Sequence, residues 1–334
     1  MGRLMAVSLL MVGAVVGAAA QDLPEGRLCH WMALSTKTGK LYVSNMGTAN
    51  VSVIDIKTNQ PVKVITIGNR PDQIAINDQT NRVYVPNALD DTVSVIDGET
   101  DEVIATIEVG RGPGGVAVDA EAKRVYVANQ LDDSLSVIDG EKNEVIGTYG
   151  TGDKPFAVAV DPKAGKLYVS NFGAGTVSVL DAGSGETVAE VGAGERPFAV
   201  LLDAAGGRLY VANLGSNSVA VVNTADNTLA ASIPVPAGAI GLGRDKTWNW
   251  VYVACINARC VAIIDPRTMA VGGSVQGFDM PVGIQVDSTN HRVYVSNRAL
   301  NVVSVLDGRS GEFLANIQLA ETPGGDWPGD LPTD

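Results

Sequence analysis

The sequence has few of the residues from which most catalytic and metal sites are built. Its 334 residues include only two histidines, His30 and His291, and three cysteines, Cys29, Cys255 and Cys260. Sequence motifs typical of hydrolases, zinc proteases and phosphate-binding loops are missing. A net charge of −13 would also repel nucleic acids and anionic membranes from the protein as a whole. We therefore expect no cofactor, and the common enzyme designs are disfavoured.

The first twenty residues have the pattern of a secretory signal. Residues 1–20 contain one early cation, Arg3, then an apolar stretch that ends in three alanines at Ala20. A retained membrane anchor is the alternative, but the stretch is shorter than the ~20 apolar residues that span a bilayer. No other segment is long and apolar enough to cross one. The pattern predicts a periplasmic or secreted protein that is cleaved after Ala20 and has no membrane span.

A repeat of 42 residues fills most of the remaining chain. The tyrosine of a YVxN string recurs at this spacing, at Tyr42, Tyr84, Tyr126, Tyr168, Tyr210, Tyr252 and Tyr294. A VSVID-like string follows each tyrosine, and a proline precedes most of them, again in constant register. Seven units cover residues 29–322, with a linker at 21–28 and an acidic, Pro/Gly-rich tail at 323–334.

Each unit reads as four short strands separated by turn residues. In the second unit these are residues 73–77, 82–87, 92–97 and 102–109, and helical periodicity is absent. Four-stranded units of this length predict an all-β fold, a seven-bladed β-propeller. An open β-solenoid is the alternative, but its coils are shorter than these units.

Two details of the repeat agree with blades that taper toward an axis. The first strand carries a small residue midway, at Ala33, Ala75, Ala117, Ala159 and Gly243, whereas Leu201 and Gln285 break the pattern. An aspartate ends two strands of most units, as at Asp55 and Asp119. We expect these carboxylates to cap turn amides. A ring of calcium ligands is the alternative, but no ligand-dense loop stands out.

The strings YVSN, YVPN and YVAN, followed by VSVID and preceded by an xPxxVAVD segment, resemble the YVTN β-propeller repeat family, which includes YncE-like exported proteins. The resemblance covers 29–322 and implies a seven-bladed propeller. Relatives of this kind serve as surface-layer modules, as accessory proteins near quinone-dependent dehydrogenases and as nucleic-acid binders, so the resemblance does not choose a function. The sixth unit departs most, with Cys255 for the motif asparagine and Ala239 for the proline; just before it, Asn223 stands for the aspartate.

In such a blade the loop entering the first strand and the turn between the second and third strands lie on one face, which we call the entry-loop face. Seven cations fall there: Arg27, Arg70, Arg111, Lys154, Arg196, Arg259 and Arg298. So do seven acids: Asp72, Asp90, Asp91, Asp132, Asp133, Asp153 and Glu195. The cations predict either an anion-binding channel mouth or a solvated rim of mixed charge.

The cysteines allow two interpretations. Cys255 and Cys260 flank a four-residue turn, so we predict a disulfide across this hairpin, which an oxidising compartment would permit. The alternative is a copper(I) site of soft ligands on the same face, drawn from Cys29, His30, Met46, Met280 and the two hairpin cysteines. Its members lie on three blades, which makes a common site difficult.

Three aromatic residues on the entry-loop side also have two interpretations. Trp31, which follows His30, forms either a wall on which a ligand stacks or, as we favour, a plug that fills the closure seam. Together with Phe156 and Phe198, next to Lys154 and Arg196, it resembles a single-stranded nucleic-acid platform, but both phenylalanines start strands and are expected in the core. In the tail, residues 326–334 are read as a mobile end or a strap over the first blade.

The sequence thus favours an exported, monomeric, non-catalytic binding scaffold that recognises a protein partner or a small anionic ligand through the entry-loop face. The candidate ligand-binding residues are His30, Trp31, Arg70, Arg111, Lys154, Arg196 and Arg298. Three alternatives stay open: single-stranded nucleic-acid binding on the same face, a metal-dependent lactonase-like hydrolase that uses carboxylates and amides, and a periplasmic copper-binding protein.

Overall fold

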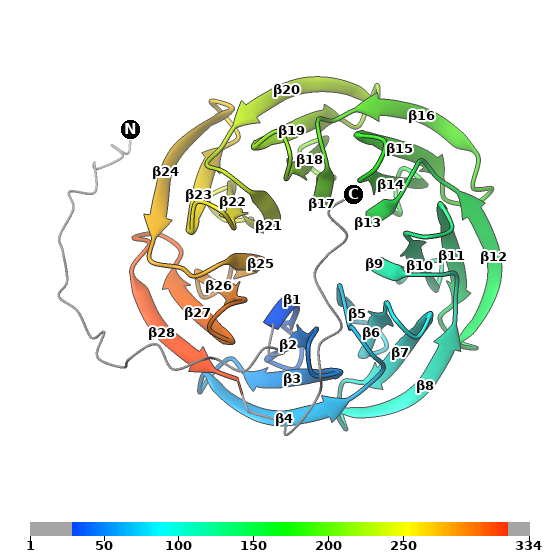
Figure 1. Cartoon of the computed structure of the whole chain (residues 1–334), viewed down its shortest axis with the longest axis horizontal. Helices are drawn as coiled ribbons and strands as arrows, with labels where there is room; N and C mark the ends of the chain where they lie inside the picture. Colours follow the sequence, from blue (N-terminus) through cyan, green and yellow to red (C-terminus); the bar gives the residue numbers. More distant parts are fainter. Residues whose placement is uncertain (1–28, 320–334) are drawn as a thin grey trace.

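A computed structural model describes residues 29–319 and confirms the predicted propeller. Its strands form seven antiparallel sheets of four strands, and each sheet is built from one sequence repeat. The sheets stand as wedges around a central axis, with the first strand of each innermost (Figure 1). Residues 29–319 contain no helix of the length and hydrophobicity that a membrane span requires. The predicted signal segment, linker, Arg27 and tail lie outside the described residues.

The strands of each blade follow one another from the axis outward. Blade 1 has β1 (Cys29–Ser35), β2 (Lys40–Asn45), β3 (Asn50–Asp55) and β4 (Gln60–Thr66); blade 2 has β5 (Ala75–Asn77), β6 (Arg82–Asn87), β7 (Thr92–Asp97) and β8 (Glu102–Glu108). Blade 3 has β9 (Pro113–Asp119), β10 (Arg124–Asn129), β11 (Ser134–Asp139) and β12 (Glu144–Gly150); blade 4 has β13 (Pro155–Asp161), β14 (Lys166–Asn171), β15 (Thr176–Asp181) and β16 (Thr187–Gly192).

The remaining blades repeat this plan. Blade 5 has β17 (Pro197–Asp203), β18 (Arg208–Asn213), β19 (Ser218–Asn223) and β20 (Thr228–Pro234); blade 6 has β21 (Ala239–Asp245), β22 (Trp250–Cys255), β23 (Cys260–Asp265) and β24 (Ala270–Gln276). Blade 7 has β25 (Pro281–Asp287), β26 (Arg292–Asn297), β27 (Val302–Asp307) and β28 (Phe313–Gln318).

The second strand of every blade is buried on both faces because neighbouring sheets pack against it. Its tyrosine is among the largest fully buried side chains, and in several blades the hydroxyl donates to a carbonyl of the next blade. Tyr126 Oη, for example, lies 3.1 Å from the carbonyl oxygen of Ala182. Apolar packing and these hydrogen bonds together join one wedge to the next.

The aspartates at the strand ends cap turns, as predicted. Asp97 Oδ1 accepts hydrogen bonds from the amides of Glu99 and Thr100, at 2.8 and 3.0 Å. These bonds stabilise the carboxylate and lower the pKa of Asp97 below its ordinary value. Within residues 29–319 no group of three or more His, Cys, Asp and Glu side chains is arranged to hold a metal ion.

The ring is closed by packing between blades 7 and 1. Buried residues of both blades share one cluster, in which Met32 and Leu41 lie with Tyr294 and Val303. Gln285, which breaks the small-residue pattern of the inner strands, donates its side-chain amide to the carbonyl oxygen of Met32 at 2.7 Å. This departure from the repeat therefore has a structural role at the closure seam.

Strand β5 is shorter than its expected span of 73–77. It pairs with β6 only over Ala75–Asn77, and upstream only an isolated bridge joins Pro71 to Asn87. Pro86 stands in the partner strand at this level and has no amide hydrogen, so the ladder lacks a donor there.

Candidate functional site

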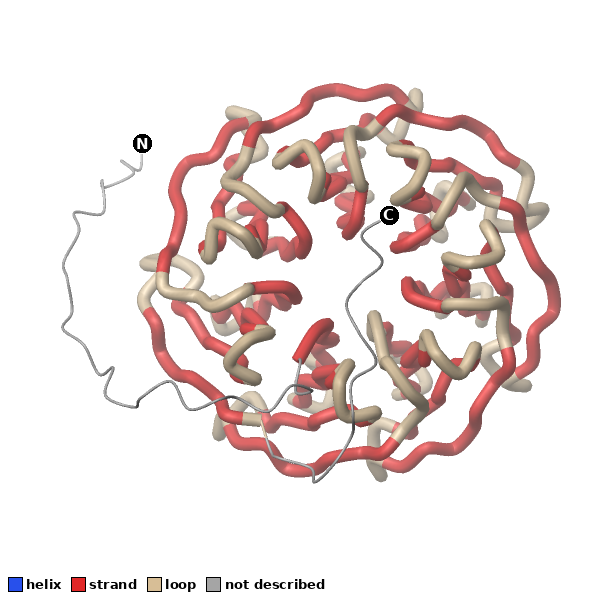
Figure 2. The backbone as a smooth tube through the Cα atoms, viewed as in Figure 1, coloured by secondary structure: helices blue, strands red, loops and turns tan. Residues whose placement is uncertain are grey.

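The entry loops and the turns between second and third strands lie on one face, as the blade order predicts. The amide of Phe172 donates to the carbonyl oxygen of Lys154 at 2.9 Å, and the amide of Leu214 donates to that of Arg196 at 3.0 Å. Figure 2 shows the entry loops, in tan, running from the outer strands toward the axis. The entry-loop face is therefore a continuous rim of paired loops.

Three rim cations occupy left-handed backbone positions directly before proline. The φ angles are 54° at Arg70, 51° at Lys154 and 52° at Arg196, whereas the matching residues of blades 3 and 6 are Gly112 and Gly238. A non-glycine residue costs about 1 kcal/mol in this conformation. The three loops thus hold a cationic side chain where glycine would be the more stable residue.

The rim cations differ in their partners. Arg111 Nε lies 2.6 Å from Asp132 Oδ1, and Arg259 forms a longer contact of 3.4 Å with Asp279. The guanidinium carbon of Arg196 lies instead 5.8 Å from the centroid of the Phe172 ring. Arg196 has no ion pair within residues 29–319, so its charge is exposed on the rim without an acidic neighbour in contact.

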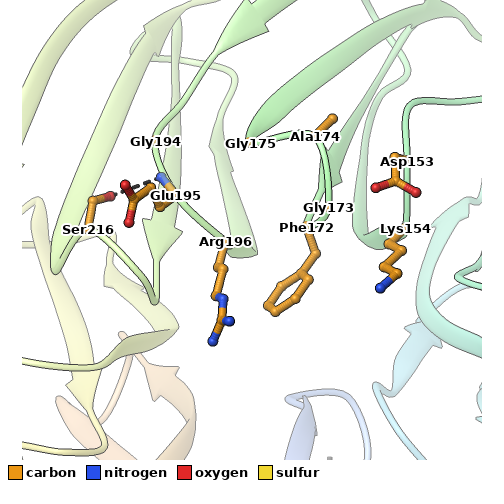
Figure 3. A pocket seen from close by; sticks show the side chains of 10 residues that line it. All are labelled: Asp153, Lys154, Phe172, Gly173, Ala174, Gly175, Gly194, Glu195, Arg196 and Ser216. Carbon is orange, nitrogen blue, oxygen red and sulfur yellow. Dashed lines mark hydrogen bonds between the residues drawn. The ribbon is translucent and has the colours of Figure 1, made fainter. Parts of the chain in front are cut away.

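A pocket of about 670 Å³ opens between blades 4 and 5 at this position. Figure 3 shows the side chains of Lys154, Phe172 and Arg196 pointing into the same space. The pocket is lined by Asp153, Lys154, Phe172, Gly173, Ala174, Gly175, Gly194, Glu195, Arg196 and Ser216. Its volume is in the range that small-molecule sites occupy.

The turn of blade 4 leaves the room for this pocket. Residues 172–175 read FGAG, whereas the matching turns of blades 2 and 3 read ALDD and QLDD. A leucine and two aspartates are thus replaced by residues that have almost no side chain. Sequence reasoning identified Lys154 and Arg196 but missed Phe172 and Ser216. Aligning the turns of the repeats in register would have singled out the blade 4 turn, residues 172–175.

Trp31 fills the channel below the rim. Its ring stacks on Phe198 at 6.1 Å and 22°, and its centroid lies 6.4 Å from that of Phe156, so blade 1 meets blades 4 and 5 across the axis. All three rings are buried. Trp31 is therefore a plug rather than a ligand-stacking wall, but it fills the channel against blades 4 and 5 and not the predicted closure seam, whose shared cluster does not contain it. The idea of these rings as an exposed stacking platform for bases is wrong. The side chain of His30 lies outside the described residues.

Cys255 and Cys260 lie opposite each other on β22 and β23. Both are buried free thiols in the structure, so the predicted disulfide is not formed there and stays a prediction. Burial raises the pKa of Cys255 to about 12. In blade 4 the matching Asn171 instead donates to Thr176 Oγ1 at 3.0 Å and to Ser178 at 2.8 Å.

The remaining candidates are placed as follows. Arg70 and Arg298 are half-buried on the rim of blades 2 and 7 and do not line the pocket. Met46 is buried in blade 1, and Met280 is half-buried before β25. The copper interpretation stays untested, because it also needs the side chains of Cys29 and His30, which are not described.

Comparisons with known proteins identify the fold. A family model described as "YNCE-like beta-propeller" matches residues 3–332. The comparison with curated proteins gives no match. Among solved structures, the chain is similar to Kuenenia stuttgartiensis hydrazine synthase, with 19% identity, a TM-score of 0.76, and coverage of 88% of this chain and 99% of that chain. It is also similar to the dihydro-heme d1 dehydrogenase NirN in complex with DHE, with 15% identity, a TM-score of 0.66, and coverage of 90% of this chain and 68% of that chain. At these identities the likeness concerns the fold alone.

Proposed function

Since the chain belongs to the YncE-like β-propeller family, we propose that it uses this rigid ring as a non-catalytic binding protein for a small anionic ligand with a flat apolar part. The ligand occupies the pocket between blades 4 and 5. One observation carries the proposal: Arg196 stands over the Phe172 ring at the pocket wall without an ion pair in residues 29–319. A guanidinium and an aromatic face together recognise a charged head and a flat body.

The neighbouring groups restrict what can bind. Asp153 and Glu195 also line the pocket and are exposed, so they disfavour ligands that carry several negative charges. Lys154 adds a second cation on the blade 4 side. A ligand with one negative charge near Arg196 and a ring against Phe172 satisfies these groups best. Because the site is open to solvent, we expect micromolar to millimolar affinity.

We further propose that the protein acts outside the cytoplasm, on the strength of the signal pattern in residues 1–20. The measurement is the N-terminus of the protein recovered from a periplasmic or culture fraction by mass spectrometry. Export with cleavage after Ala20 predicts a chain that starts at Gln21. Recovery of the uncleaved chain in the cytoplasm alone would refute it.

Binding is tested by calorimetric titration of the purified protein with phenylacetate, benzoate and phenylphosphonate. We expect at least one of them to bind, and Arg196→Gln to weaken binding about tenfold. The matched control is Arg111→Gln on blade 3, because Arg111 is paired with Asp132 and does not line the pocket. Failure of all three to bind at millimolar concentration, or an equal effect of both substitutions, would refute the proposal.

A further inference from the structure

The turns of the entry-loop face cap neighbouring amides in two regular ways. In the first, the third residue of a turn accepts a hydrogen bond from the entry loop of its own blade. Asp90 Oδ2 accepts from the amide of Asn69 at 2.7 Å, and Asp132 Oδ2 accepts from that of Arg111 at 2.7 Å. In blade 5 a serine performs the same role, with Ser216 Oγ 3.1 Å from the amide nitrogen of Glu195.

In the second, the fourth residue of a turn accepts from the entry loop of the next blade. The amides of Gly112 and Lys154 donate at 2.8 Å to Asp91 Oδ1 and Asp133 Oδ1. Asn217 Oδ1 accepts from Gly238 at the same distance. The donor is each time the left-handed residue that precedes the first strand.

Blade 4 lacks both caps. Ala174 stands at the third position and Gly175 at the fourth, so neither turn residue offers a side-chain oxygen to the amides of Asp153 and Arg196. Within residues 29–319 these two amides have no hydrogen-bond acceptor, in contrast to their counterparts in the neighbouring blades. All four residues line the pocket. The pocket is thus the space that two carboxylates fill in blades 2 and 3.

We infer that the ligand is an aromatic monocarboxylate whose carboxylate replaces the missing turn side chain and accepts a hydrogen bond from the Arg196 amide. The inference rests on the proposed function and names its ligand class. In blades 3 and 4 the equivalent amides, those of Gly112 and Lys154, are capped by an aspartate carboxylate. The Arg196 guanidinium contacts the same carboxylate, and the apolar body of the ligand packs on Phe172. A dianionic phosphate or phosphonate is disfavoured by Asp153 and Glu195.

The test compares ligands and variants that restore the caps. Phenylacetate is expected to bind at least about fivefold more tightly than phenylphosphonate. Gly175→Asp copies Asp133, whose φ of 47° is also left-handed, and is expected to weaken phenylacetate binding about tenfold. Its Cβ would lie 2.9 Å from the carbonyl oxygen of Gly194, so the loop must shift slightly. Ala174→Ser copies Ser216 and restores only the cap of the Asp153 amide, so it is the matched control and should leave phenylacetate binding within about twofold.

A direct readout is the backbone amide spectrum of ¹⁵N-labelled protein during titration with phenylacetate. The Arg196 resonance should move downfield as its amide gains an acceptor, whereas that of Gly112, which Asp91 already caps, should not. If the anions bind and Arg196→Gln weakens them, but phenylphosphonate binds as well as phenylacetate or Gly175→Asp has no effect, the carboxylate inference is wrong and the proposed function survives. If no anion binds, both fail.

Discussion

Removing the hydroxyl of Tyr252 tests how neighbouring blades are held together. It donates to the buried carbonyl oxygen of Gly308 in blade 7 at 2.7 Å. In other blades an arginine or lysine at the start of the second strand reaches the same kind of carbonyl, as Arg124 does at 3.0 Å. Blade 6 has Trp250 at that position. The Gly308 carbonyl therefore depends on the tyrosine hydroxyl far more than its counterparts do.

Substitution by phenylalanine removes this oxygen and keeps the ring. Tyr252→Phe leaves a buried carbonyl without its donor, which costs about 1–3 kcal/mol. Tyr126→Phe should cost about 1 kcal/mol or less, because the Ala182 carbonyl keeps its bond from Arg124. Tyr210→Phe should be neutral or slightly stabilising, since the Tyr210 hydroxyl is buried and has no hydrogen-bond partner.

The assay is thermal and urea unfolding of the wild type and the three variants. For a fold of this size 1 kcal/mol corresponds to about 2 °C in Tm, so Tyr252→Phe should lower Tm by about 2–6 °C. The other two variants should stay within about 2 °C of the wild type. Equal losses for Tyr252→Phe and Tyr210→Phe would show that the hydroxyl bond does not contribute to blade contact, and the reasoning would be refuted.

Three further predictions concern a glycine substitution, the pH dependence of stability and the two hairpin cysteines. Gly241→Ala should destabilise strongly, because its Cβ would overlap the carbonyl oxygen of Val282 in the next blade, whereas Gly147→Ala on an outer strand meets nothing and serves as the control in the same unfolding assay. Burial raises the pKa of six repeat tyrosines, so the stability that is complete below about pH 10 should fall as the pH rises further. Backbone hydrogen bonds lower the pKa of the capping aspartates, so the stability that is present above about pH 4 should fall as the pH decreases. Urea midpoints measured across pH check both signs, and a flat profile contradicts them. Protein refolded with oxidised glutathione should lose about 2 Da as Cys255 and Cys260 join and two glutathione thiols are released; full alkylation of both thiols after denaturation would contradict the disulfide.

The fold was predictable because the repeat carries its information redundantly. Apolar residues on both faces of the second strand, a turn-capping aspartate and a constant spacing each point to the same blade. What escaped prediction depends on contacts between repeats. The role of Gln285 requires knowing that blade 7 meets Met32 of blade 1, and the short β5 depends on a missing donor at Pro86 in its neighbour.

The candidate site was predictable only in part, for the same reason. Composition and topology place the cations on one face, but not which of them an acid neutralises. That is decided by the turn residues nearby: Asp132 of the same blade reaches Arg111, whereas Gly175 of the preceding blade offers no carboxylate to Arg196. The strongest signal of the pocket is the lack of long side chains in residues 173–175, and a search for chemically active residues passes over it.

The salt dependence of binding separates the proposed ligand from a nucleic acid. At a net charge of −13, long-range repulsion opposes any anion, and salt screens this repulsion over about 8 Å at physiological strength. Salt also weakens the contact with Arg196, so the two effects oppose each other for a monocarboxylate. Its affinity should change by less than about threefold between 50 and 300 mM NaCl. Binding of single strands through many phosphates would instead decrease steeply with salt. A steep decrease for phenylacetate would contradict a single-cation site.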